Sequence, residues 1–220
     1  MFQTDSFSLI ALFVGMSLLP FLAMVATSYL KIVVVISLVR NALGVQSIPP
    51  NMVVNAIALI LSFYVMAPVV QEGWDIYNEK AAVNKVEKKV SETQIAMEAA
   101  EPMREWLIKQ TDERSRAFFV STAEQLWAKE GEETAEVNPD SFFILIPSFC
   151  VSELTKAFQI GFLVYLPFIA IDIIISNILL AMGMMMVSPV TISLPFKLLL
   201  FVMVNGWTLL IQGLVRGYIQ

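Results

Sequence analysis

The stretch PSFCVSELTKAFQIGFLVYLPFIAIDIIISNILLAMGMMMV, residues 147–187, is the longest of the apolar stretches in this chain. It is almost wholly apolar and is longer than the roughly 20 residues that a helix needs to cross a lipid bilayer. Pro167 lies in its middle, where a proline removes a backbone donor and breaks or kinks a helix. The stretch therefore predicts two helical pieces, residues 147–166 and 168–187.

Apolar segments also fill most of the remaining chain, at residues 7–30, 52–70 and 190–215. Each is long enough for one membrane crossing. Since 57% of the 220 residues are hydrophobic and 15% are charged, the chain is too apolar for an ordinary soluble domain. These features predict an all-α membrane protein made of apolar helical hairpins.

Charged residues are concentrated in an insert, residues 72–140, which holds 25 of the 33 charges, nine basic and sixteen acidic. Its helix-forming composition predicts a small helical domain between an N-terminal apolar hairpin, residues 1–71, and C-terminal apolar hairpins, residues 141–220. The valines at a helical repeat are Val83, Val86 and Val90, and the expected core residues are Trp106, Leu107, Phe118 and Phe119.

The charges of the loops predict the orientation in the membrane. Lys31 and Arg40 lie between the first two apolar stretches, and the acidic insert follows the second. Because cytoplasmic loops carry an excess of basic residues, residues 31–50 are expected in the cytoplasm and the insert in the periplasm. No basic residue precedes the first apolar stretch and no small-residue cleavage pattern follows it, so a cleaved signal peptide is not expected.

The residues needed for most enzyme mechanisms are missing from the sequence. The chain has no histidine, and Cys150 is its only cysteine, which excludes histidine-dependent triads, Cys/His zinc sites and disulfides within the chain. Phosphate-binding and dinucleotide-binding loops are also missing. The net charge of -5 argues against nucleic acid as a partner. An enzyme is thus the poorer hypothesis, and no cofactor or metal is expected.

Four ionisable residues lie inside the apolar segments: Glu153, Lys156, Asp172 and Lys197. Such groups are costly in lipid unless they pair or face protein or water, so each is a candidate functional residue. If the last apolar stretch is one helix, its polar residues lie within about 80° of one another around the axis. That stripe suits either a water-filled conduit or a helix-helix seam. Its members are Lys197, Asn205, Thr208 and Gln212.

The methionines Met182, Met184, Met185 and Met186 are concentrated just before Ser188 and Pro189. On a helix they would point all round the axis, whereas a loop at a helix end could present three of them to one space. Methionine adapts to irregular or changing surfaces, so several copies facing a common axis would close a hole. The alternative is a lipid-exposed or core-filling patch.

The C-terminal block, residues 147–210, resembles the type III secretion export-gate family, whose flagellar member is the P subunit and whose virulence counterpart is the R subunit. The segments SELTKAFQIGF, LPFIAID, AMGMMM, LPFK and GW occur in the order and spacing of that family. Residues 26–51 are similar to the first loop of the family. The segment LVRNALGVQSIPPN resembles the virulence, or injectisome, branch of the family more than the flagellar branch. The expectation that no signal peptide is cleaved points to the same branch.

The resemblance implies a pore at the bacterial inner membrane. Family members assemble as a helical ring of five copies with the S and T export-gate subunits, beside the switch and large export-gate subunits, and unfolded secreted proteins pass through the middle. The methionine run, Met184 to Met186 with Met182 beside it, is implied to be a gasket in the closed channel. The apolar segments are implied to be buried against neighbouring subunits and raised toward the periplasm.

Glu153 and Lys197 are expected to form a salt bridge between adjacent subunits, because the family pattern retains both SEL and LPFK. Lys156, one helical turn from Glu153, is the local alternative partner. A different function also stays open: a small-solute or ion transporter that uses Asp172, Glu153 and Lys197 as a relay.

Overall fold

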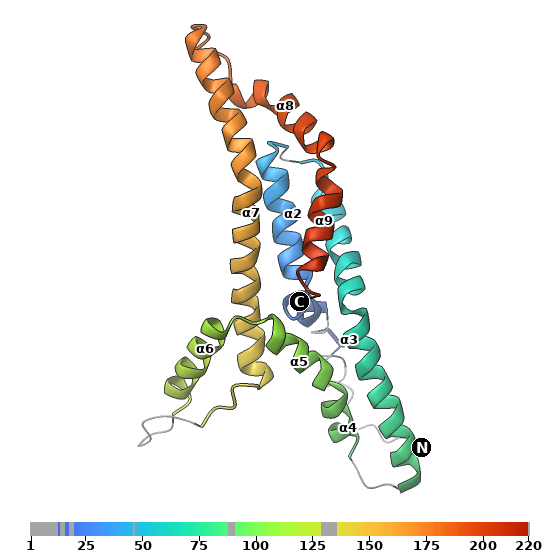
Figure 1. Cartoon of the computed structure of the whole chain (residues 1–220). Helices are drawn as coiled ribbons and strands as arrows, with labels where there is room; N and C mark the ends of the chain where they lie inside the picture. The colour runs from blue at the N-terminus through green and yellow to red at the C-terminus, as the bar shows by residue number, and fades with distance from the viewer. Residues whose placement is uncertain are drawn as a thin grey trace. The chain divides into compact units, whose positions relative to one another are not determined.

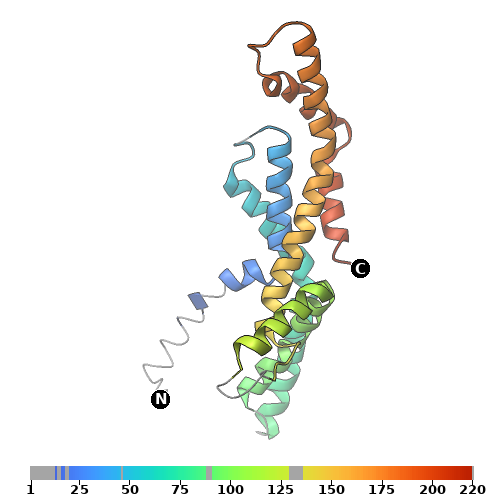
Figure 2. The same ribbon diagram turned by 90° about the vertical axis from the view of Figure 1, so that its left-hand side faces the viewer.

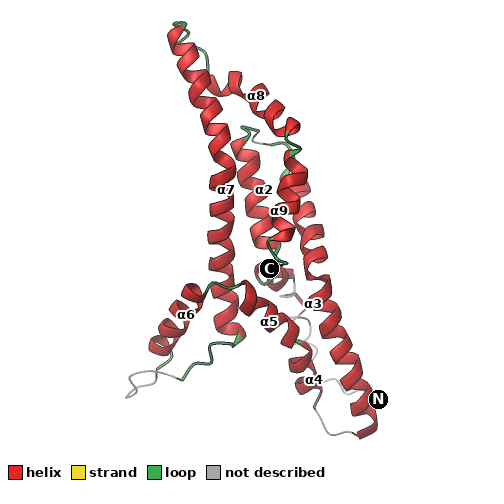
Figure 3. Ribbon diagram, in the orientation of Figure 1, coloured by secondary structure: helices red, strands yellow, loops and turns green. Residues whose placement is uncertain are grey.

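The computed structural model describes residues 13, 16, 17, 20–45, 47–87, 91–128 and 136–219, with the side chains of residues 85–87 left aside. Every regular element in this part of the chain is an α-helix, which confirms the predicted all-α fold (Figure 3). The labelled helices, in chain order, are α2 (Tyr29–Ala42), α3 (Asn51–Glu87), α4 (Glu92–Ala99), α5 (Glu101–Gln110), α6 (Glu113–Leu126), α7 (Phe142–Ala181), α8 (Pro189–Met203) and α9 (Gly206–Arg216) (Figure 1).

The chain forms two compact units. The first unit comprises residues 1–30 and 66–153, and the second comprises residues 31–65 and 154–220. Both α3 and α7 continue from one unit into the other. Helix α3 therefore passes through residue 72, where the charged insert begins, without interruption.

Two of the described helices are long and apolar enough to cross a membrane, α3 over Asn51–Asn84 and α7 over its full length. Helices α8 and α9 meet the same criteria only together, and they are bent by 60° at their junction. The apolar stretch at residues 52–70 thus lies within the single long helix α3, and most of the stretch at residues 147–187 lies within α7. Much of the first stretch, residues 7–30, lies outside the described residues.

Helix α7 is continuous through Pro167, so the prediction of two helical pieces is wrong. A proline removes one backbone hydrogen bond and crowds one carbonyl, and in a helix of 40 residues the bonds on either side keep the turn in place. The helix also ends earlier than residue 187, at Ala181. Gly183 stops it, with a φ of 74° that favours glycine.

Helix α2 forms the core of the second unit. Its buried side chains Ile32, Val35, Ile36 and Val39 recur at helical spacing and make one apolar face. Helix α7 runs alongside α2 in both views (Figures 1 and 2). A Cβ placed on Gly161 of α7 would lie 2.3 Å from Leu38 Cδ1 of α2, so glycine at this position permits the close approach.

The first unit has its core where α5 meets the beginning of α7. Trp106 and Leu107 are buried as predicted, and the Trp106 ring lies 5.3 Å from that of Phe149. The predicted core role of Phe118 is wrong, because its side chain is 61% exposed and packs edge-to-face on Phe119 of the same helix, α6. Among the predicted valines, Val83 is exposed, and Val86 and Val90 are outside the described side chains.

Candidate functional site

The methionine run lies in the connection between α7 and α8, as the sequence predicted for a helix end. Two hydrogen bonds close α7 in a Schellman arrangement, from Gly183 N–H to Leu180 O (3.0 Å) and from Met184 N–H to Leu179 O (2.9 Å). Helix α8 then begins at Pro189, whose fixed φ suits the first position of a helix. Residues 182–188 therefore form a short loop between two defined helix ends, hereafter the methionine loop.

The methionine side chains of this loop are exposed within the chain. The exposed fraction rises from 41% at Met184 to 80% at Met185 and 99% at Met186, and it is 66% at Met182. Figure 2 shows the loop at one end of the α7–α8 hairpin. Such a group of exposed apolar side chains at a tip indicates a contact surface.

Lys197 is the centre of a polar cluster in the second unit. Its ammonium group is almost fully buried and donates to Asp172 Oδ2 of α7 at 2.6 Å and to Ala42 O of α2 at 3.3 Å. Ser193, buried one turn before Lys197 on α8, donates to Asp172 Oδ1 at 2.5 Å. Ala42 is the last residue of α2, and the carbonyls at a helix C-terminus favour a cation.

The sequence analysis grouped Asp172 and Lys197 only in the transporter hypothesis and expected Glu153 as the salt-bridge partner of Lys197, so it missed the Asp172–Lys197 pair. The spacing around the methionine run could have revealed the pair. Asp172 lies thirteen residues before Met185, and Lys197 lies twelve residues after it. An antiparallel hairpin that turns at Met185 places the two residues at the same level.

Glu153 is fully buried and belongs to the first unit, whereas Lys197 belongs to the second. Lys156 is half-buried on α7. The expected salt bridge between Glu153 and Lys197 joins different copies of the chain, and it stays a prediction.

The predicted polar stripe on a single last helix is wrong. Asn205 adopts a left-handed conformation, with a φ of 52°, and separates α8 from α9 at the 60° bend. A helical wheel cannot be continued through such a residue. Lys197 is buried against α7 and α2, whereas Asn205, Thr208 and Gln212 are exposed.

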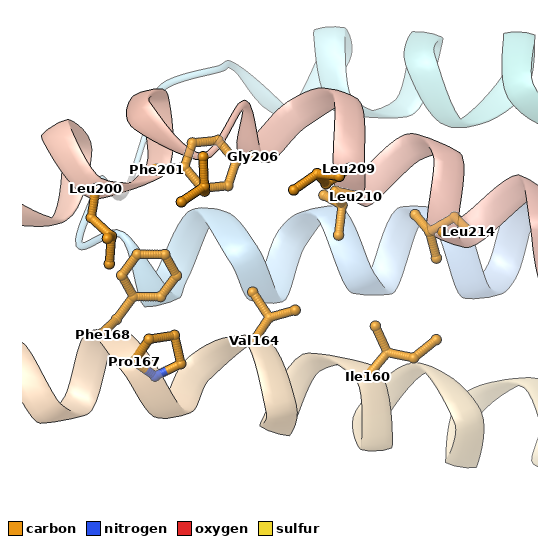
Figure 4. Close-up of a pocket in the computed structure, with 12 residues that line it drawn as sticks. Ile160, Val164, Pro167, Phe168, Leu200, Phe201, Gly206, Leu209, Leu210 and Leu214 are labelled. Carbon is orange, nitrogen blue, oxygen red and sulfur yellow. The ribbon is translucent and has the colours of Figure 1, made fainter.

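An apolar cavity of about 550 Å³ lies between α7 and the α8–α9 pair (Figure 4). Pro167 and Phe168 of α7 line it on one side, and Phe201 and Leu214 line it on the other. The Phe168 and Phe201 rings approach to 6.4 Å between centroids at one end. Along the cavity, α7 is therefore separated from α9.

A second buried cation was not anticipated from the sequence. Lys31 was expected in a cytoplasmic loop, but it lies in α2 and is 3% exposed. Its ammonium group lies 3.5 Å from the centre of the Tyr218 ring, a cation–π contact that holds the region after α9 against the beginning of α2. Among the described residues, no group of three or more His, Cys, Asp or Glu side chains could hold a metal ion.

Comparison with known proteins places the chain in a family. Residues 12–214 match the FliP family. The Yop proteins translocation protein R of Yersinia pestis is 53% identical over 218 residues, which cover 97% of both chains. The hypersensitivity response secretion protein HrcR of Ralstonia nicotianae is 48% identical over 96% of both, and the virulence protein YscR of Salmonella typhimurium is 44% identical over 96% of this chain and 95% of its own.

The match extends over nearly the whole chain and includes both apolar blocks and the insert. The two long apolar helices agree with a protein of the inner membrane. The chain therefore belongs to the FliP family of type III secretion proteins, as a structural component of the secretion apparatus.

Proposed function

We propose that this chain is the pore-forming core subunit of the type III export gate, which conducts unfolded secreted proteins across the bacterial inner membrane. The observation that carries the proposal is the exposed methionine loop at the tip of the α7–α8 hairpin. Exposed apolar side chains are unfavourable in water unless they meet other apolar groups. In a ring of copies, the tips meet around a common axis and supply those groups to one another.

Methionine suits a seal that must open for many different chains. Its unbranched, polarisable side chain fills irregular gaps and rearranges without a fixed partner geometry. Met184, Met185 and Met186 of several copies would close the channel at rest and yield to a passing polypeptide. Within one copy, all three side chains keep at least 41% of their surface exposed, and this surface is available for contact between copies.

The assembly that we propose contains five copies of this chain with the S and T subunits, and it meets the switch and large export-gate subunits. Residues 72–140 lie in the periplasm. The names of the relatives refer to translocation, secretion and virulence, which supports the injectisome branch.

The salt bridge between Glu153 and Lys197 of adjacent copies is part of this proposal. A lysine ammonium group has three N–H donors, and two of those of Lys197 are used by Asp172 and Ala42. The third has no acceptor among the described residues of its own chain. This third donor is the one that would meet the Glu153 carboxylate of a neighbouring copy, and Glu153 is itself fully buried.

Replacement of Met184, Met185 and Met186 together by alanine tests the seal. We expect the variant ring to assemble with the S and T subunits and to leak small ions across the inner membrane in the non-secreting state. Ion conductance of inner-membrane vesicles measures the leak. The matched control is Met52→Ala with Met203→Ala, two exposed methionines outside the loop. A triple variant that assembles normally and adds no conductance would contradict the proposed seal.

The alternative function, a small-solute or ion transporter, receives no support from the site. A relay needs titratable groups along a water path, and here Asp172 and Lys197 satisfy each other. Purification in detergent separates the two functions. A large ring that captures the S and T subunits favours the gate, and a monomer or dimer with substrate-dependent proton flux favours the transporter.

A further inference from the structure

Three polar residues join the two arms of the α7–α8 hairpin. Asp172 lies on α7 before its end at Ala181, and Ser193 and Lys197 lie on α8 after its start at Pro189. Residues four apart in a helix share a face, so Ser193 and Lys197 both reach the same carboxylate, one at each oxygen. The cluster therefore ties the arms at one level, and the methionine loop projects beyond it.

Helix α8 needs such a tie because Pro195 lies inside it, midway between Ser193 and Lys197. A proline in a helix interior removes a backbone hydrogen bond and makes a kink easier. The two contacts to Asp172 span this weak turn. They thus hold α8 on α7 where the α8 backbone is least constrained by its own hydrogen bonds.

Further along the hairpin, the contact between these two arms is apolar. Further from the loop, the apolar cavity lies between α7 and the α8–α9 pair, and the Phe168 and Phe201 rings bridge it at one end. Among the hydrogen bonds described here between α7 and α8, those of the polar cluster lie nearest the methionine loop.

The same cluster connects the hairpin to the core of the second unit. Lys197 donates to Ala42 O at the C-terminus of α2, whose apolar face is buried. A cation at this position matches the partial negative charge of the helix end. The position of the hairpin is thereby fixed against a helix that is itself held by packing.

We propose that Asp172, Ser193 and Lys197 form a clamp that sets the position of the methionine loop, so that Asp172 and Ser193 are positioning residues of the gate. This inference rests on the proposed gating function for its effect on conductance. It rests on the contacts described above for its effect on the hairpin.

Distances between spin labels test the clamp in the full-length chain in detergent. The labels are attached to cysteines at Ile174 of α7 and Leu199 of α8, both exposed, in a chain carrying Cys150→Ser. We expect a single narrow distance in the parent chain. That narrow distance should be lost in Asp172→Asn with Ser193→Ala, because both contacts to α8 are weakened together.

Two further variants separate the clamp from general damage to the hairpin. Asp172→Asn with Lys197→Gln replaces the ion pair by two neutral amides that can bond to each other, and it should recover the narrow distance. Asn177→Ala with Thr191→Ala removes exposed polar groups from the same helices and should leave the distance unchanged. If Asp172→Asn with Ser193→Ala keeps the narrow distance, the clamp does not exist.

Conductance of the assembled gate then decides whether the clamp positions the seal. A lost narrow distance accompanied by a leak supports both statements. If the distance broadens while the vesicles stay tight, and the triple methionine variant leaks, the positioning role is overturned and the gate stands. If the triple methionine variant also stays tight, the proposed function fails, and the distances alone still decide whether the clamp exists.

Discussion

Lys197 combines two kinds of partner in one side chain. Within its own copy it is paired with Asp172 at 2.6 Å, and in the proposed ring it also meets Glu153 of a neighbour. A charge reversal at Lys197 therefore does more than break the contact between copies. It also places a second carboxylate beside Asp172, and like charges at this distance repel each other strongly in apolar surroundings.

The salt bridge between copies is best tested with Asp172 neutralised. In a chain carrying Asp172→Asn, we expect Glu153→Lys alone and Lys197→Glu alone to abolish ring assembly. Stranding a buried charge costs roughly 3–5 kcal/mol. The double reversal should restore part of the ring, as measured by size-exclusion chromatography of the detergent extract.

Cross-linking provides an independent check of the same pair. Cysteines at positions 153 and 197, in a chain carrying Cys150→Ser, should form a disulfide between copies. A double reversal that assembles no better than the worse single variant, together with no cross-link, would rule the pairing out.

Gly161 and Gly213 make a matched pair of helix-interior glycines. A Cβ on Gly161 meets Leu38 of α2 at 2.3 Å, whereas a Cβ on Gly213 meets nothing within 4 Å. We expect Gly161→Ala to lower the free energy of unfolding by about 1–3 kcal/mol through overpacking. Gly213→Ala should raise it by up to about 1 kcal/mol, because alanine favours the helix. Thermal unfolding in detergent measures both.

A double variant checks that the Gly161 effect comes from the contact with α2. Gly161→Ala with Leu38→Ala makes room for the added methyl group, so the two changes should not add. Additive losses would mean that the helices tolerate the methyl group and that glycine has another role at this position.

At the scale of elements, the bend between α8 and α9 depends on one backbone conformation. Asn205 has a φ of 52°, and Phe201 packs over Gly206 so closely that a Cβ there would lie 2.3 Å from its ring. Asparagine tolerates the left-handed region better than most residues do. The pair Asn205–Gly206 therefore allows a sharp turn that two more bulky residues would oppose.

Substitutions at Asn205 test this explanation, because its side chain is exposed and packing changes little. Asn205→Ala should lower the free energy of unfolding by about 1 kcal/mol, the order of the cost of a left-handed L-residue. Asn205→Gly should leave it unchanged or raise it slightly. Chemical denaturation in detergent compares them, and equal stabilities for the alanine and glycine variants would argue against strain at this residue.

The elements also show which parts of the fold are readable from sequence. Helical structure and the loop at the methionines follow from composition and from Gly183, Ser188 and Pro189. The continuity of α7 through Pro167 does not, because it depends on the bonds of a long helix rather than on one residue. The α8–α9 break rests on a left-handed asparagine, which has no unambiguous sequence pattern. The Asp172–Lys197 pair became visible only once the hairpin was known.

At the scale of the whole molecule, the two units divide the chain differently from its composition. The charged insert shares a unit with the first part of α7, and the contact between Trp106 and Phe149 lies in that unit. Most of α2 shares the other unit with the methionine loop and the α8 arm of the hairpin. A boundary drawn from charge density alone cannot find this division. The long helices α3 and α7 each begin in one unit and end in the other.

The proposed periplasmic position of the insert is tested by labelling intact cells. Glu92 is exposed at the beginning of α4, and Glu92→Cys in a chain carrying Cys150→Ser gives one accessible thiol. Serine at position 150 retains a donor for Val25 O, which Cys150 contacts at 3.1 Å. We expect a membrane-impermeant maleimide to label this chain from the periplasm. Labelling that requires a broken inner membrane would reverse the orientation.

The exposure of the methionine loop would give the proposed gate a chemical weakness. A thioether takes up one oxygen atom from a peroxide and becomes a polar, chiral sulfoxide, and this reaction favours the most accessible sulfur atoms. Met186 and Met185, at 99% and 80% exposure in one copy, are the most accessible of the loop. In the proposed gate, oxidised tips would hydrate where reduced tips exclude water, so a bacterium under oxidative attack would have to keep these sulfur atoms reduced to keep its membrane tight.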